Sequence, residues 1–218
     1  MSVEVHDIES KYQVTSAPVA PIAPVIIANP GPLGLSGFAL TTFVLSLHNA
    51  GAGLAPTGPH GIVTGLALGY GGLVQLLAGM WEFRTGNTFG ATAFSSYGGF
   101  WLSFGMIFIP GFNILGGYGT DKVTLEKSIG YYLLGWTIFT GIMLIACHRS
   151  NVGIVTLFFF LFVTFVLLTA AKFNGSIVTQ QAGGALGVIT AFIAWYNALA
   201  GLLTKESSYF QLPIGPLN

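Results

Sequence analysis

The sequence predicts an all-α integral membrane protein with six transmembrane helices per protomer. Charged residues make up only 6% of its 218 residues and hydrophobic residues 53%, whereas soluble domains carry about 25% charged residues. Six apolar segments also follow one another along the chain, and each has about the 20 residues that a helix needs to cross a bilayer. Together these observations exclude a soluble globular domain with a large core.

The six segments define a domain over residues 29–206. Residues 1–28 are predicted to be a disordered cytoplasmic tail, because prolines recur in APVAPIAPVIIA and favour extended backbone. The first residues, MSVEVHDIESKYQ, lack the apolar core of a signal peptide, so the first spanning helix is expected to direct insertion. Residues 207–218 are expected to form a short cytoplasmic C-terminal tail.

The first helix, expected over about 33–52, has an unusually well marked start. Its opening NPGPLGL places prolines in the first turn, where a missing N–H costs nothing. Asn29 is a good N-cap residue, since its side-chain oxygen can accept from the first amides. The free amides and the positive end of the helix dipole would then favour a small anion, although such a start is also found in helices that are simply capped.

The other segments are expected at about 61–82, 88–110, 128–147, 152–172 and 182–204, separated by turn-forming residues. Asn87 and Thr88, after Gly86, predict a capped start for the third helix. The first and third helices would begin on the same side of the membrane. Two helix N-termini facing one vestibule would attract a small carboxylate without a fixed cation.

An even number of spans places both termini on one side of the membrane. With the N-terminus inside, four of the seven basic residues fall inside: Lys11, Arg84, Arg149 and Lys205. Because positive residues favour the cytoplasmic side, both termini are predicted to be cytoplasmic, in a multi-pass protein of the plasma membrane.

Small residues recur at helical spacing in two segments and predict close helix packing. The second segment has glycines at 61, 65, 69, 72 and 79, and the sixth has small residues at 183, 187, 191, 194, 198 and 201. The bulky run LFFFLFVTF over 157–165 is interpreted as a lipid-facing or inter-subunit surface, with some side chains able to line a constriction.

Ionisable residues are rare within the expected spans, so each is a functional candidate. Glu82 ends the second span, as an interfacial anchor or a proton site. His48, near the end of the first, is an interfacial hydrogen-bonding group or a proton relay. The histidines and the single cysteine show no metal-ligand spacing, and no nucleophile–base pair is evident. We therefore expect no metal, no cofactor and no enzymatic activity, and the zero net charge gives no reason to expect a nucleic-acid partner.

Uncharged polar residues remain to line a path through the membrane. The candidates are Asn29, Thr42, Asn49, Asn87, Thr88 and Tyr97. Beyond a polar mouth, aromatic and aliphatic side chains would have to form a narrow apolar gate, because the chain offers little else at membrane depth.

The segment NPGPLGLSGFALTTFVLSLHN (29–49) closely resembles the NPAPLGL signature of the acetate uptake transporter family, with Gly31 where alanine is usual. LLAGMWEFRTGNTFGATAFSSYGGFW (76–101) resembles its second long motif, and LPIG (212–215) its end. The resemblance covers residues 29–215. The family that the chain resembles includes succinate–acetate permeases and fungal acetate permeases.

This resemblance implies a homohexamer in which each protomer has its own pore for acetate, related monocarboxylates and, in some members, succinate. It also implies a narrow hydrophobic constriction. By motif, Phe38 and Tyr97 would belong to it, with Leu161 as the third member and Ala194 as a further selectivity position; these last two lie outside the motifs. Phe38 is nine residues after Asn29, or about 13 Å at the helical rise, which agrees with a mid-membrane gate.

Three functions stay open on this basis. The first is a short-chain carboxylate channel or proton-coupled permease. The second is an ammonia or ammonium conduit, which also needs an apolar pore. The third is a membrane sensor or scaffold that transports nothing.

Overall fold

The chain is described here by a computed structural model, which gives the placement of residues 26–55, 58 and 61–217. The predicted N-terminal tail over 1–28 therefore lies almost wholly outside the described residues. Within these residues the structure is helical, with one isolated antiparallel bridge between Asn151 and Pro216.

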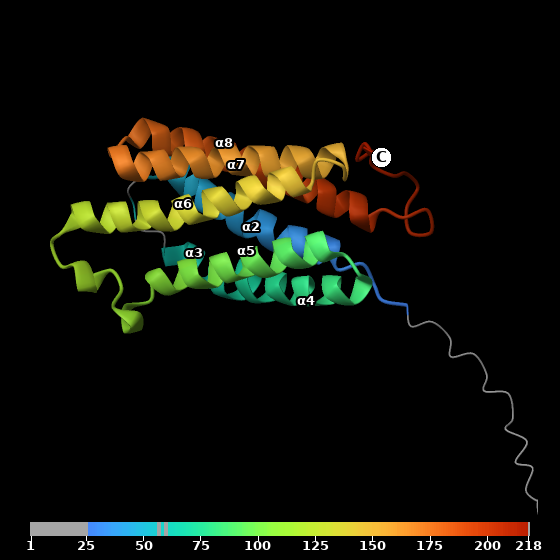
Figure 1. Cartoon of the computed structure of the whole chain (residues 1–218), viewed down its shortest axis with the longest axis horizontal. Coiled ribbons are helices and arrows are strands. Elements are labelled where there is room, and N and C mark those ends of the chain that lie inside the picture. The colour runs from blue at the N-terminus through green and yellow to red at the C-terminus, as the bar shows by residue number, and fades with distance from the viewer. Residues whose placement is uncertain (1–25, 56–57, 59–60, 218) are drawn as a thin grey trace, which may run out of the picture.

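Six long helical rods make up the described part of the chain (Figure 1). They are α2 (Gly31–Ala50), α3 (Gly61–Leu68) continued by the π-helix η2 (Gly69–Val74) and α4 (Gln75–Thr85), α5 (Thr88–Ile107), α6 (Lys122–Ala146), α7 (Val152–Asn174) and α8 (Ile177–Leu202). Two short 3-10 helices, η3 (Pro110–Phe112) and η4 (Gly116–Tyr118), connect α5 to α6. Five rods are long and apolar enough to cross a membrane; α5, rich in Gly, Ser and Thr, is not among them.

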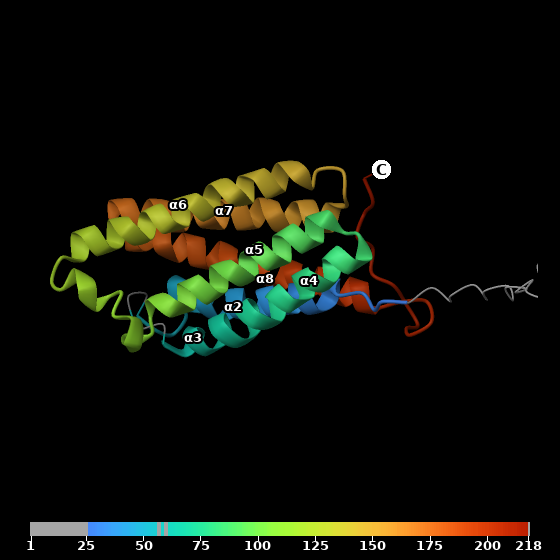
Figure 2. The same cartoon turned by 60° about the horizontal axis from the view of Figure 1, so that its bottom comes forward.

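The rods run side by side along the long axis of the molecule (Figures 1 and 2). They pack in the order α2, α8, α7, α6, α5, α4 and back to α2. Helices α2, α5 and α7 begin at the end where the described chain starts and where its C-terminus lies, which we call the terminal end (Figure 1). Helices α3, α6 and α8 begin at the opposite end.

Capping residues set two helix starts earlier than the hydropathy pattern predicts. The Asp121 side chain accepts from the Thr124 amide at 2.9 Å, so α6 begins at Lys122 instead of 128. The Ser176 hydroxyl accepts from the Thr179 amide at 3.2 Å and starts α8 at Ile177 instead of 182. The first turns of these helices are polar, so a prediction from hydropathy alone starts the helices too late.

The predicted glycine face of the second span is wrong in part, because this span contains a π-helix. At Gly65 and Gly69, none of the described residues lies within 4 Å of an added Cβ. Gly71 instead packs against Thr41, whose hydroxyl oxygen would lie 2.5 Å from such a Cβ. A π turn inserts an extra residue, and this rotates the following glycines onto a different face.

The small-residue face of the sixth span is confirmed. Gly187 packs against Ser46 and Gly201 against Pro32, both on α2. Ala191 and Ala194 are fully buried. Small side chains on α8 thus allow it to pack closely along α2, as expected where apolar burial gives no drive between helices.

The bulky run on α7 is not simply a lipid-facing surface. Phe159 is 51% exposed, whereas Leu157, Phe158, Leu161 and Phe165 are at most 5% exposed. Lipid-facing and buried positions are equally apolar in a membrane helix, so composition could not separate the two faces of this run.

Candidate functional site: two cavities and a constriction

Two cavities enter the bundle from its opposite ends. The first cavity, of about 500 Å³, lies at the terminal end among the starts of α2, α5 and α7. The second cavity, of about 730 Å³, lies toward the opposite end, among the later turns of α2, α5 and α7 and the first turns of α6 and α8. Both are lined mainly by apolar side chains.

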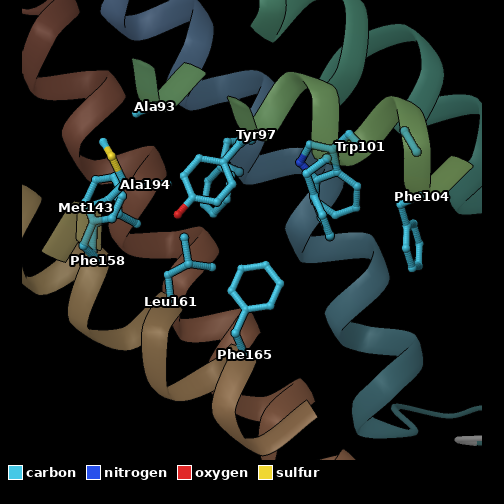
Figure 3. Close-up of a cluster of buried hydrophobic side chains, with 14 of the residues drawn as sticks. Ala93, Tyr97, Trp101, Phe104, Met143, Phe158, Leu161, Phe165 and Ala194 are labelled. Atoms are coloured by element: carbon cyan, nitrogen blue, oxygen red, sulfur yellow. The ribbon is translucent and has the colours of Figure 1, made fainter. Parts of the chain in front are cut away.

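The two cavities share three lining residues, Phe38 on α2, Tyr97 on α5 and Leu161 on α7. All three are at most 5% exposed, and the rings of Phe38 and Tyr97 meet edge to face with centroids 6.0 Å apart. In Figure 3 the hydroxyl oxygen of Tyr97 points toward the Leu161 side chain. We call these three residues the constriction, a name that refers to their lining both cavities.

Tyr97 is held from several sides. Its hydroxyl lies 2.8 Å from the Thr140 hydroxyl of α6, and its ring contacts Trp136, Phe139 and Phe158. Aromatic pairs of this kind fix ring orientation as well as burying area. The position of the tyrosine in the constriction is therefore set by α6 and α7 as much as by its own helix.

Glu82 lies inside the mouth of the first cavity instead of facing outward as an interfacial anchor. It is 3% exposed, and its carboxylate accepts from the Asn87 amide group at 2.8 Å and the Thr85 hydroxyl at 3.3 Å. An added Cβ at Gly31 would lie 3.6 Å from its other oxygen, and one at Gly90 would lie 3.0 Å from its carboxyl carbon. A carboxylate thus stands between the starts of α2 and α5.

This arrangement corrects the expected carboxylate site at two free helix N-termini. Asn29 precedes the N-cap residue, Pro30, and accepts from the Gly31 amide at 3.0 Å. Asn87 is the N-cap of α5 and accepts from the Gly90 amide at 3.0 Å. One amide at each of the two starts is thus already bonded to a side chain. The Glu82 carboxylate beside them would repel an anion, while Arg149 lines the same cavity.

The third helix start at the same mouth, that of α7, is capped by the end of the chain. The amides of Val152 and Gly153 donate to the carbonyls of Gly215 and Ile214 at 2.8 and 3.1 Å. The Tyr196 hydroxyl donates to the Pro213 carbonyl at 2.7 Å. The LPIG motif therefore fixes the α6–α7 connection, whose residues 149–151 line the first cavity.

Unpaired buried polar atoms lie on both sides of the constriction. Gln75 lines the first cavity, is 1% exposed, and its side-chain carbonyl has no partner among the described residues. Thr42 and Trp101 line the second cavity, and their hydroxyl and indole N–H are likewise unpaired among the residues that the structure places. Buried polar groups are nearly always hydrogen-bonded, so these atoms are candidates to meet a solute.

Most residues predicted from sequence line these cavities, but three do not. Asn29, Glu82 and Asn87 line the first cavity, while Thr42 and Asn49 line the second. Thr88 is exposed at the helix start, and neither it nor His48 lines a cavity. Ala194 is fully buried in the apolar core behind the constriction.

Sequence reasoning missed Gln75, Trp101 and Thr140. Gln75 could have been identified from the sequence, because it is an isolated side-chain amide within an apolar span. Trp101 is the last residue of the long motif over 76–101. Nothing in the sequence distinguishes Thr140 from other helical threonines.

Comparison with known proteins identifies relatives of the whole transmembrane region. The chain is 55% identical over 185 residues to Ammonia transport outward protein 2 of Saccharomyces cerevisiae, covering 85% of this chain and 65% of that protein. It is 52% identical over 197 residues to Acetate permease A of Emericella nidulans, covering 86% and 65%. The chain thus spans about two thirds of the length of these fungal relatives.

A bacterial relative matches over nearly its whole length. The Succinate-acetate/proton symporter SatP of Escherichia coli is 35% identical over 189 residues, covering 87% of this chain and 96% of that protein. A solved structure described as the bacterial acetate channel SatP superposes with a TM-score of 0.76 at 35% identity, covering 87% of this chain and all of that one. Residues 11–218 match the family model described as GPR1/FUN34/yaaH. The chain belongs to the GPR1/FUN34/yaaH family.

Proposed function

We propose that this protein carries acetate and related short-chain carboxylates, with succinate as a further candidate, through a pore within each protomer. The observation that carries this proposal is that two cavities from opposite ends meet at Phe38, Tyr97 and Leu161. Relatives named as an acetate permease and a succinate–acetate symporter support the choice of solute. All six rods would cross the bilayer, with α5 shielded by its neighbours and both termini cytoplasmic at the plasma membrane.

The homohexamer remains part of this proposal. Large apolar side chains are exposed along the outside of the bundle, including Ile138, Ile142 and Ile145 on α6. Such surfaces suit lipid or further copies of the chain. Cross-linking in native membranes, followed by mass measurement of the solubilised complex, tests the number of subunits.

The constriction would act as an apolar gate. A buried polar group without a partner costs several kcal/mol, and a bare charge costs more. A carboxylate therefore passes only if it is protonated or if nearby donors support it. The unpaired Thr42 hydroxyl and Trp101 indole N–H, in the second cavity, are the donors available next to the gate. The unpaired atom of Gln75, in the first cavity, is a carbonyl oxygen, which can accept only from a protonated acid.

An ammonia conduit is the second candidate, because one relative is named as an ammonia transport protein. Purified protein in liposomes separates the candidates through uptake of labelled acetate and labelled methylammonium, each compared with protein-free vesicles. Acetate uptake above the protein-free rate supports the proposal. Methylammonium uptake alone would favour the conduit, and uptake of neither solute would leave a sensor or scaffold.

Phe38→Ala tests the gate itself. Removing the ring should widen the passage and raise the uptake of larger acids such as lactate at least tenfold relative to acetate, equivalent to about 1.4 kcal/mol. Phe43→Ala is the matched control, since Phe43 lies on the same helix, contacts Phe192 and Trp195, and lines neither cavity. Unchanged relative rates for Phe38→Ala would contradict the gate.

A further inference from the structure

The hydrogen-bond direction at Tyr97 can be assigned from its neighbours. The Thr140 hydroxyl lies 2.8 Å from the Tyr97 hydroxyl and 2.7 Å from the Trp136 carbonyl oxygen. A threonine hydroxyl has a single hydrogen, and a carbonyl oxygen can only accept. Both contacts are hydrogen bonds only if Thr140 donates to Trp136 and Tyr97 donates to Thr140.

With this assignment, Tyr97 cannot donate a hydrogen bond to a solute in the passage. Its single O–H is directed to α6, so the oxygen offers only lone pairs to a solute between the cavities. Such an oxygen accepts from the O–H of an undissociated carboxylic acid. Toward a carboxylate it presents only electron density, which adds to the cost of moving a charge through this apolar gate.

We propose that Thr140 is a positioning residue that fixes Tyr97 as a hydrogen-bond acceptor, so that the constriction passes the undissociated acid in preference to the carboxylate. This inference rests on the proposed function and names the protonation state of its solute. Thr140 is fully buried and lines neither cavity. It therefore acts through Tyr97 and not by contact with the solute.

Apart from Tyr97 itself, the charged and titratable groups that line one cavity do not line the other. Glu82, Cys147 and Arg149 line the first cavity, and Glu126 and Lys172, which pair at 2.7 Å, line the second. None of these five lines both cavities. The groups packed against the Tyr97 ring from α2, α6 and α7 are Phe38, Trp136, Phe139 and Phe158, which do not titrate.

Electrical recording tests this inference directly, because only the anion carries current. In planar bilayers with sodium acetate at pH 7.5, wild-type protein should give no acetate current above protein-free membranes. Thr140→Val keeps the shape of the side chain but removes the acceptor, so the Tyr97 O–H becomes free to donate to a carboxylate. This variant should pass an acetate current at least tenfold above the background of protein-free membranes.

Two further variants separate positioning from a structural role. Thr140→Ser restores the hydroxyl and should restore the absence of current. Adding Tyr97→Phe to Thr140→Val removes the freed donor and should abolish the new current. Equal currents in Thr140→Ser and Thr140→Val would overturn the proposal, and so would a current in Thr140→Val that Tyr97→Phe does not reduce. The proposal would also fail if Glu82→Gln removed the pH dependence of acetate uptake while Thr140→Val left it unchanged.

Wild-type protein alone keeps the inference testable if Thr140→Val does not fold. In liposomes holding a pH-sensitive dye, acetate uptake should release one proton per acetate into the lumen and should not respond to an imposed potassium diffusion potential. Potential-driven acetate uptake, or an acetate current in wild type, would overturn the inference while leaving acetate transport intact. No acetate uptake at any pH would instead refute the proposed function.

Discussion

The two cavities differ in which groups already have hydrogen-bond partners. At the first cavity, amides at the helix starts donate to Asn29, to Asn87 and to the carbonyls of Ile214 and Gly215, and the buried Glu82 adds a carboxylate. At the second cavity the hydroxyl of Thr42 and the indole N–H of Trp101 have no partner among the described residues. At the mouth that helix dipoles would favour for an anion, amides at all three helix starts are thus already bonded. The unpaired donors of Thr42 and Trp101 lie at the other cavity.

The largest predicted change in the half-saturating acetate concentration comes from substitutions at the second cavity. Trp101→Phe removes the indole N–H while keeping an aromatic ring, and Thr42→Val removes the hydroxyl while keeping the volume. A buried hydrogen bond left unmade costs about 1–3 kcal/mol, so each change should raise the half-saturating acetate concentration about 5- to 150-fold. The half-saturating concentration is measured from the concentration dependence of labelled acetate uptake.

Ser103→Ala is the control for these donor variants. Ser103 lies on α5 near Trp101, pairs with Tyr132 and the Phe100 carbonyl, and lines neither cavity. If Ser103→Ala shifts half-saturation as much as Trp101→Phe, the effect belongs to α5 packing and not to a solute site.

A smaller and opposite effect is expected at the first cavity. Glu82→Gln keeps an acceptor for the Asn87 amide group at 2.8 Å but removes the negative charge. Repulsion between two like charges a few ångströms apart at this mouth costs about 1 kcal/mol or more. The half-saturating acetate concentration at pH 7 should fall about fivefold. An increase in this value would show that Glu82 binds the solute instead of repelling its anion.

The cap on α7 can be broken at Gly215. Its φ is +64°, and an added Cβ would lie 2.8 Å from the Val152 side chain. Gly215→Ala should weaken the bonds to Val152 and Gly153 by about 1–2 kcal/mol and speed hydrogen exchange of these two amides about 5- to 30-fold.

Gly53→Ala is the control for this variant. Gly53 has a similar φ of +72° but open space around an added Cβ. Equal exchange at Val152 and Gly153 in both variants and wild type would mean that the chain end does not hold this connection.

The smallest effect concerns Asp121, which starts α6 outside the spans. Hydrogen bonds from the Thr124 hydroxyl and amide lower the pKa of this exposed carboxyl. A lowered pKa in the folded state stabilises the protein above the ordinary pKa, and this contribution is lost as the pH falls below about 4. Asp121→Asn keeps a capping oxygen but should remove that pH dependence, measured as protease sensitivity of the α5–α6 connection between pH 5 and 3. An unchanged pH dependence would exclude Asp121 as its source.

Local features of the chain were sufficient for much of the fold. Helix starts and ends depend on nearby residues, so Asn87 could be predicted as a cap. The caps Asp121 and Ser176 move the starts of α6 and α8 by a few residues and do not change the number of helices. The motifs around Phe38 and Tyr97 also marked two of the three residues that the cavities share. The sixth-span face of small residues was readable because helical spacing alone places such residues together.

Tertiary structure decided the remaining features, because each depends on a neighbour that is distant in sequence. The buried face of 157–165, the inward position of Glu82 and the contact of Thr140 with Tyr97 arise where separate helices meet. Hydropathy does not distinguish a side chain against lipid from one against another helix, since both surroundings are apolar. The sequence alone therefore determined where helices form and which motifs they carry, and packing determined which side chains face the passage.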